Sequence, residues 1–130
     1  MIVVDASAMI GALLREPGSK AVQARILNPR ETLHAPHLLD VEVAQVIRRF
    51  VARREIGVSR GREALDDLSD LPVHRYAHDL LLSRVWRLRD NLSAYDAVYV
   101  ALAEALGAPL LTRDRRVANA AGHNATIELI

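Results

Sequence analysis

The 130-residue sequence contains no cysteine, and only one of its 17 basic residues, Lys20, is a lysine. Without cysteine the protein can have no disulfide framework, no thiolate metal site and no cysteine nucleophile. The single lysine removes most candidates for a catalytic or Schiff-base amine. The glycine-rich motifs GxxxxGK[ST] and GxGxxG are also absent, so nothing in the sequence supports a loop that cradles nucleotide phosphates.

Neither charge sign dominates, because 17 basic side chains face 16 acidic ones for a formal net charge of +1. A net field this small does not steer a partner, so any attraction to nucleic acid must come from local patches. No apolar run approaches the roughly 20 residues of a membrane span. The apolar N-terminal run lacks a basic leader and is interrupted by Asp5. We therefore expect a cytoplasmic protein with no membrane partner.

Short apolar segments alternate with helical patterns along the whole chain. A length of 130 residues with 51% hydrophobic and 25% charged residues is typical of one folded domain, which we expect to span residues 1–130. The patterns predict strands at residues 1–4, 33–35, 72–75, 109–112 and 126–130. They predict helices at residues 7–14, 19–28, 38–57 with Gly57 at the end, 59–71, 77–89, 93–106 and 113–121. Such alternation favours an α/β fold, a three-layer α/β/α arrangement around a mainly parallel sheet of about five strands.

Four acids are predicted to meet at one edge of this sheet. Asp5 ends the first strand and Asp114 follows the fourth, and ligands of open parallel sheets bind beyond the carboxyl ends of the strands. Glu42 and Asp96 lie near the starts of two helices that can begin at the same edge. Crowded carboxylates repel each other unless a cation neutralises them, and oxygen ligands favour Mg²⁺ or Mn²⁺. Such a site suits metal-assisted phosphodiester hydrolysis.

Each acid also has a structural interpretation that stays open at this point. Asp5 can be a helix N-cap, Ser93 and Asp96 have the spacing of a capping box, and Asp114 can complement a helix dipole. Glu42 is harder to explain structurally, because it interrupts a densely apolar helix where an unpaired buried carboxylate costs several kcal/mol.

Residues 92–103, followed by residues 108–114, resemble the C-terminal signature of PIN-domain ribonucleases of the VapC toxin type. Residues 3–8 resemble the first strand and acid of that family, and residues 36–43 its second acidic element. The resemblance covers essentially the whole chain and implies a PIN-like fold. It implies a metal-dependent endoribonuclease whose catalytic and metal-binding acids are Asp5, Glu42, Asp96 and Asp114.

The resemblance has further implications for the site and its partners. Ser7 and Thr112 become candidates for positioning water or the Mg²⁺ or Mn²⁺ ion. The partners would be RNA, a cognate VapB-type antitoxin and a second copy of the chain, as a homodimer within a larger toxin–antitoxin complex. Some relatives carry another acid shortly after the position of Asp114, where this chain has Arg115 and Arg116. Whether one or two metal ions bind stays open.

Three arginines surround the last acid, and guanidinium groups hold phosphates that carboxylates would repel. We therefore expect RNA contacts from Arg113, Arg115 and Arg116. Two alternatives are a catalytically silent PIN-like module that binds RNA or protein, and a housekeeping PIN nuclease for RNA maturation. Retention of all four acids argues against the silent module, and the short length favours the toxin.

Overall fold

Five short strands form one parallel sheet in the computed structural model, which describes residues 1–130. The strands are β1 (Ile2–Val4), β2 (Leu33–Pro36), β3 (Val73–Tyr76), β4 (Leu110–Thr112) and β5 (Ile127–Leu129). Their spatial order is β3-β2-β1-β4-β5, and every neighbouring pair is parallel. The central strand β1 is completely buried, as expected of an apolar strand in a parallel sheet that is covered on both faces.

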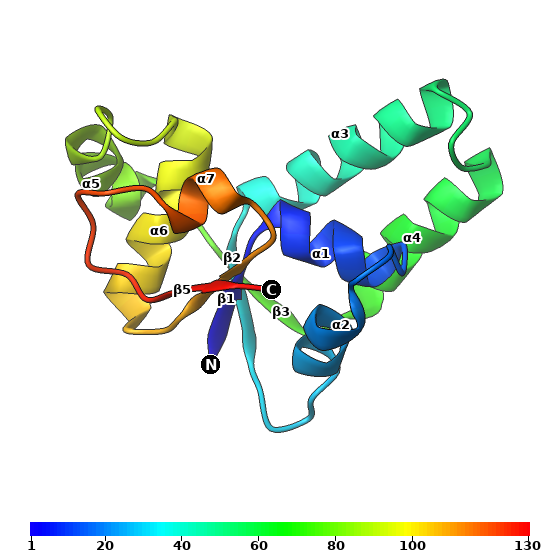
Figure 1. Cartoon of the computed structure of the whole chain (residues 1–130), viewed down its shortest axis with the longest axis horizontal. Helices are drawn as coiled ribbons and strands as arrows, with labels where there is room; N and C mark the ends of the chain where they lie inside the picture. Colours follow the sequence, from blue (N-terminus) through cyan, green and yellow to red (C-terminus); the bar gives the residue numbers. More distant parts are fainter.

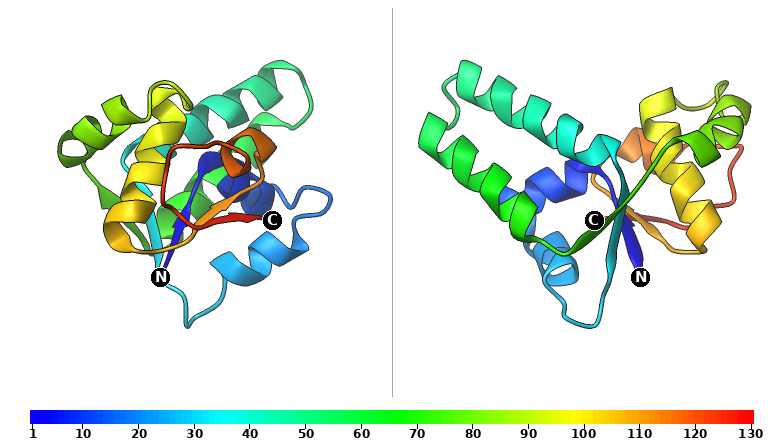
Figure 2. Two further views of the ribbon diagram at one scale, coloured as in Figure 1. Left: turned by 60° about the vertical axis from the view of Figure 1, so that its left-hand side comes forward. Right: turned by 180° about the vertical axis from the view of Figure 1, so that it is seen from behind.

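Helices cover the two faces of the sheet (Figures 1 and 2). They are α1 (Ala6–Leu13), α2 (Lys20–Ile26), α3 (Leu38–Ala52), α4 (Val58–Asp70), the 3₁₀ helix η1 (Asp79–Leu81), α5 (Leu82–Arg87), α6 (Ala94–Leu106) and α7 (Arg115–Ala118). Helices α1 to α4 lie on one side, and α5 and α6 lie on the other. The predicted three-layer α/β/α fold is therefore confirmed. None of the helices has both the length and the apolar composition needed to cross a membrane.

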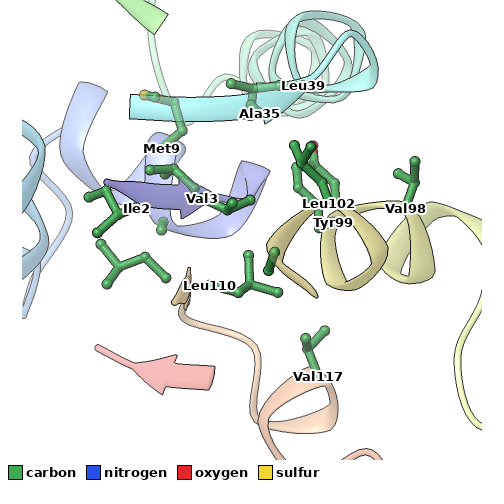
Figure 3. Packing of buried hydrophobic residues seen from close by; sticks show 14 of the residues in the cluster. Ile2, Val3, Met9, Ala35, Leu39, Val98, Tyr99, Leu102, Leu110 and Val117 are labelled. Carbon is green, nitrogen blue, oxygen red and sulfur yellow. The ribbon is translucent and has the colours of Figure 1, made fainter. Parts of the chain in front are cut away.

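The apolar core joins the sheet to the helices on both sides. Figure 3 shows Val3 and Leu110 of the strands in one cluster with Tyr99 and Leu102 of α6. Seven consecutive residues of α6, from Ala97 to Ala103, are buried. Because this helix is apolar almost all round, it is held between the sheet and α5 and cannot rotate to expose another face.

Several predicted helix boundaries were wrong. The long helix ends at Ala52, and Gly57 is the N-cap of α4 instead of the end of α3. Arg54 has a φ of 58°, and this left-handed residue turns the chain before Gly57 is reached. The helix predicted at residues 77–89 consists of η1 followed by α5, and the one predicted at 113–121 is reduced to α7.

The carboxyl edge of the sheet collects the starts of several helices. Helices α1, α3 and α7 follow β1, β2 and β4 directly, so all three begin at that edge. Helix α6 ends at Gly107, which has the left-handed φ of 61° typical of a helix C-cap, and the chain then enters β4 at the opposite edge. Helix α6 therefore also starts at the carboxyl edge, and the four predicted acids are directed to one region.

Candidate active site

Asp5 is held by three uncharged hydrogen-bond donors. Its Oδ1 accepts a hydrogen bond from the Ser7 hydroxyl at 2.6 Å and one from the Ala8 backbone N–H at 2.9 Å. Its Oδ2 accepts from the hydroxyl of Thr112, which comes from β4. The side chain is the N-cap of α1, so the predicted capping role of Asp5 is confirmed. No basic side chain forms an ion pair with this buried carboxylate.

Burial raises the pKa of Asp5 above its ordinary value, although the hydrogen bonds from Ser7, Thr112 and Ala8 act in the opposite direction. The charge of Asp96 adds to the increase. A carboxylate with a raised pKa is one whose negative charge is poorly compensated by its surroundings. Asp5 therefore lies in a place where a bound cation would be stabilising.

Glu42 extends from the second turn of α3 toward α6. Its Oε1 accepts a hydrogen bond from the Tyr99 hydroxyl at 2.6 Å. Burial raises the pKa of Glu42, the Tyr99 hydrogen bond opposes this effect, and the charges of Asp96 and Asp5 raise the pKa further. Sequence reasoning missed the role of Tyr99. The available signal was a tyrosine in a fully apolar helical stretch, because a buried phenol requires a hydrogen-bond partner.

Asp96 lies in the first turn of α6, where Ser93 is the N-cap. The Ser93 hydroxyl accepts a hydrogen bond from the Asp96 backbone N–H at 3.2 Å and also contacts Asp96 Oδ2 at 3.2 Å. The cap therefore uses the backbone of Asp96 and does not require its charge. Because that charge raises the pKa of both Asp5 and Glu42, three of the four predicted acids share one electrostatic environment.

Asp114 lies beside this group but has a cationic partner. Its carboxylate caps α7 through the Arg116 N–H at 2.9 Å and accepts from the Arg116 guanidinium at 2.7 Å. The hydrogen bond from Arg116 holds the pKa of Asp114 below its ordinary value. The Asp114 N–H donates to the hydroxyl of Thr112, which in turn donates to Asp5. The fourth acid is thus linked to Asp5 through Thr112, and its own charge is already paired with Arg116.

Comparison with known proteins identifies the family to which this acidic edge belongs. Residues 2–123 match the PIN domain. The chain is 50% identical over 119 residues to the ribonuclease VapC9 of Mycobacterium tuberculosis, an alignment that covers 92% of this chain and 90% of that protein. The chain is a VapC-type member of the PIN-domain family.

Solved structures of low sequence identity share the fold. PAE2754 from Pyrobaculum aerophilum superposes with a TM-score of 0.72 at 24% identity, covering 98% of this chain and 83% of that chain. VapBC2 from Rickettsia felis, solved with a DNA fragment from its promoter, has a TM-score of 0.71 at 14% identity, with 98% of both chains covered. The PIN fold is thus retained while most side chains differ.

The carboxylates of this PIN domain fit a hard divalent cation in their chemistry. None of the nine ion pairs in the structure includes Asp5, Glu42 or Asp96. All the candidate ligands are oxygen atoms, which Mg²⁺ and Mn²⁺ prefer. However, no three His, Asp or Glu side chains are arranged to hold a metal ion as they stand. The donor set and its unpaired charge fit the ion, and the side chains must draw closer to coordinate it.

Two of the three arginines predicted to contact RNA have partners within the PIN domain. The Arg113 guanidinium donates to Glu16 at 2.7 Å and to the Pro17 carbonyl at 3.0 Å, and it crosses α1 at Gly11. A Cβ at Gly11 would lie 2.7 Å from Arg113 Nη1, so a larger residue there would displace the Arg113 side chain. Arg116 pairs with Asp114, whereas Arg115 is exposed and has no side-chain partner. The RNA contacts of all three remain predictions.

Proposed function

We propose that this VapC-type PIN domain is a divalent-metal-dependent endoribonuclease that cleaves RNA phosphodiester bonds, with Asp5, Glu42, Asp96 and Asp114 as its metal-binding acids. The observation that carries the proposal is that the charge of Asp96 acts on both Asp5 and Glu42 while none of these three acids forms an ion pair. A bound Mg²⁺ or Mn²⁺ would activate water for attack and stabilise the developing negative charge.

The chain's own residues orient the carboxylates for this role. Ser7, Thr112 and the N-terminal N–H of α1 fix the plane of Asp5, and its Oδ2 accepts only one of these bonds. Tyr99 holds Oε1 of Glu42, which leaves Oε2 without a protein donor. Because each carboxylate keeps acceptor capacity, all three can bind an ion without losing the contacts that position them.

Asp114 requires a rearrangement before it can take part. Its carboxylate accepts from Arg116, whose side chain is 83% exposed. Asp114 can serve a metal ion only after it leaves this guanidinium, which would free Arg116 for an RNA phosphate. The arrangement leaves both one-ion and two-ion sites open.

The proposed partners follow from the relatives. The Rickettsia felis structure contains a VapBC pair. We infer that the present chain likewise binds a cognate VapB-type antitoxin, and that it forms a homodimer within a larger complex. Because its proposed substrate is RNA, we infer that the protein acts in the cytoplasm.

The test of the activity is cleavage of RNA by purified protein freed of antitoxin. We expect cleavage with Mg²⁺ or Mn²⁺ and none with EDTA. Mg²⁺ should also raise the melting temperature, more at pH 8 than at pH 5, because protonated carboxylates compete with the ion. Undiminished cleavage in EDTA would exclude the metal mechanism. RNA binding without cleavage under every metal condition would favour the catalytically silent module.

A further inference from the structure

The outer half of α3 and the turn that follows it carry arginines that have no side-chain partner in the protein. Arg48, Arg49, Arg53 and Arg54 are all exposed. None of them takes part in an ion pair or donates a side-chain hydrogen bond. Helix α3 leaves the carboxyl edge of the sheet and runs outward beside α4, as Figures 1 and 2 show. Unpaired positive charge therefore extends outward from the acidic site.

Two of these arginines lie on the same face of the helix as Glu42. Glu42, Gln45, Arg49 and Arg53 follow one another at spacings of three or four residues, which places them along one stripe. Arg48 lies about a third of a turn away from that stripe. At a rise of about 1.5 Å per residue, Arg49 lies about 10 Å beyond Glu42. This separation places Arg49 to bind a phosphate that neighbours the one being cleaved.

A groove runs along α3 from Glu42 to Arg49, the first arginine of this stripe. It is lined on α3 by Glu42, Gln45 and Arg49 with apolar neighbours, and on α6 by Tyr95. Tyr95 precedes Asp96 in the chain and is 65% exposed. An exposed aromatic ring provides a stacking surface for a base, and a guanidinium group binds a phosphate. The groove thus offers a stacking contact from Tyr95 and a phosphate contact from Arg49 beside Glu42.

We propose that this groove and the Arg49–Arg53 stripe bind single-stranded RNA beside the scissile bond, with one base on Tyr95. The proposal rests on the ribonuclease function proposed above and names where its substrate lies. RNA fits better than a protein segment, because the stripe presents unpaired guanidinium groups and a polyanion satisfies several of them at once. The stripe also adds an attraction for phosphates on the α3 side of the mutually repelling carboxylates.

RNA binding is measured by fluorescence anisotropy with a labelled single-stranded RNA pool in EDTA, so that no cleavage occurs. The double variant R49A/R53A should weaken binding at least about tenfold at low salt. It should reduce the slope of log affinity against log salt by about 0.7 per lost phosphate contact. The control is R48A/R54A, which removes the same charge from α3 and the turn that follows it and should retain affinity within about twofold.

A second pair of variants tests the base contact. Tyr95→Ala should weaken RNA binding about fivefold or more, whereas Tyr95→Phe, which keeps the ring, should bind as the wild type does. With Mg²⁺ present, the R49A/R53A variant should raise KM for RNA cleavage more than it lowers kcat. All these side chains are exposed, and thermal melts verify that the variants are folded.

Each other outcome has a definite meaning. Equal losses in R49A/R53A and R48A/R54A would overturn the proposal, because binding would then follow net charge alone. Unchanged RNA affinity with lost inhibition by the antitoxin would overturn it in favour of a protein partner. If the wild type binds RNA through Arg49 and Arg53 but never cleaves it, the groove stands and the proposed ribonuclease function falls.

Discussion

Helices α3 and α6 each carry two acids whose surroundings differ sharply. On α3, Glu42 accepts from the neutral Tyr99 hydroxyl, whereas Asp40, two residues earlier, accepts two hydrogen bonds from the Arg75 guanidinium at 2.7 and 2.9 Å. On α6, Asp96 has only Ser93, whereas Glu104 accepts two hydrogen bonds from Arg84 at 2.7 and 2.9 Å. Like Asp5, Glu42 and Asp96 have hydroxyl partners. Asp40 and Glu104 have guanidinium partners, and so does Asp114 at the carboxyl edge.

This difference separates two uses of a carboxylate. An arginine-paired acid such as Glu104 has a lowered pKa because its partner compensates its charge, so it can join two elements without any ion. Glu42 and Asp5 have raised pKa values because burial and neighbouring acids leave their charges uncompensated. Hydroxyl donors fix the orientation of a carboxylate and leave its charge available. The variants below are chosen to test that distinction.

Removing charge from the hydroxyl-held acids should have the largest effect. We expect Asp5→Asn and Asp96→Asn each to lower RNA cleavage by more than about 100-fold, the upper end of the losses seen when only the supporting partners of a metal ligand are changed. The fold should persist, because Asn caps a helix nearly as well as Asp and the Ser93 cap uses the Asp96 backbone. Initial cleavage rates and thermal melts measure the two effects. Full activity in both variants would show that these acids are only structural.

Removing the Tyr99 hydroxyl should have the next largest effect. Tyr99→Phe keeps the ring in the core but leaves Glu42 without its donor. We expect an affinity for Mn²⁺ about 10- to 100-fold lower by calorimetry, with a loss of stability of about 1 kcal/mol. The matched control is Tyr76→Phe, since the Tyr76 hydroxyl bonds to His34 at 2.7 Å on the β2–β3 side of the sheet. Equal metal affinity in the two variants would argue against the positioning role of Tyr99.

The sequence contained enough to predict the fold and the convergence of the acids. Apolar runs ending at Asp5 and just before Asp114 indicated strands, and parallel pairing brings such strand ends to one edge. The ion pairs between side chains could not be predicted from the sequence. Arg113 and Glu16, for example, are 97 positions apart in the chain and meet only across α1. The early end of α3 depends on the conformation of Arg54, for which the sequence gives no signal of the kind that glycine provides. The roles of the acids themselves remain predictions.

The pH dependence of stability should differ between the two kinds of acid. Burial raises the folded pKa of Glu42 above its ordinary 4.5, so the folded state holds the proton more tightly than the unfolded state. Without metal, stability should therefore fall as the pH rises from that ordinary value through the raised one. Glu42→Gln removes one repelling charge at constant volume, so its stability should fall less steeply. Melts of both proteins between pH 4 and pH 8 test this, and parallel curves would contradict it.

Breaking an arginine-paired acid should have the smallest effect. Arg84→Ala leaves Glu104 with the Asn124 N–H at 2.8 Å as its remaining donor. We expect a loss of about 1 kcal/mol or less, as for other partly exposed ion pairs. The lowered pKa of Glu104 means that the pair's contribution is present above its ordinary 4.5 and is lost as the pH falls through the lowered value, so wild type and variant should converge in acid. RNA cleavage and Mn²⁺ affinity should stay within about twofold of the wild type, because Glu104 lies at the far end of α6 from Asp96. A loss of metal affinity as large as that expected for Tyr99→Phe would show that guanidinium-paired acids also contribute to metal binding.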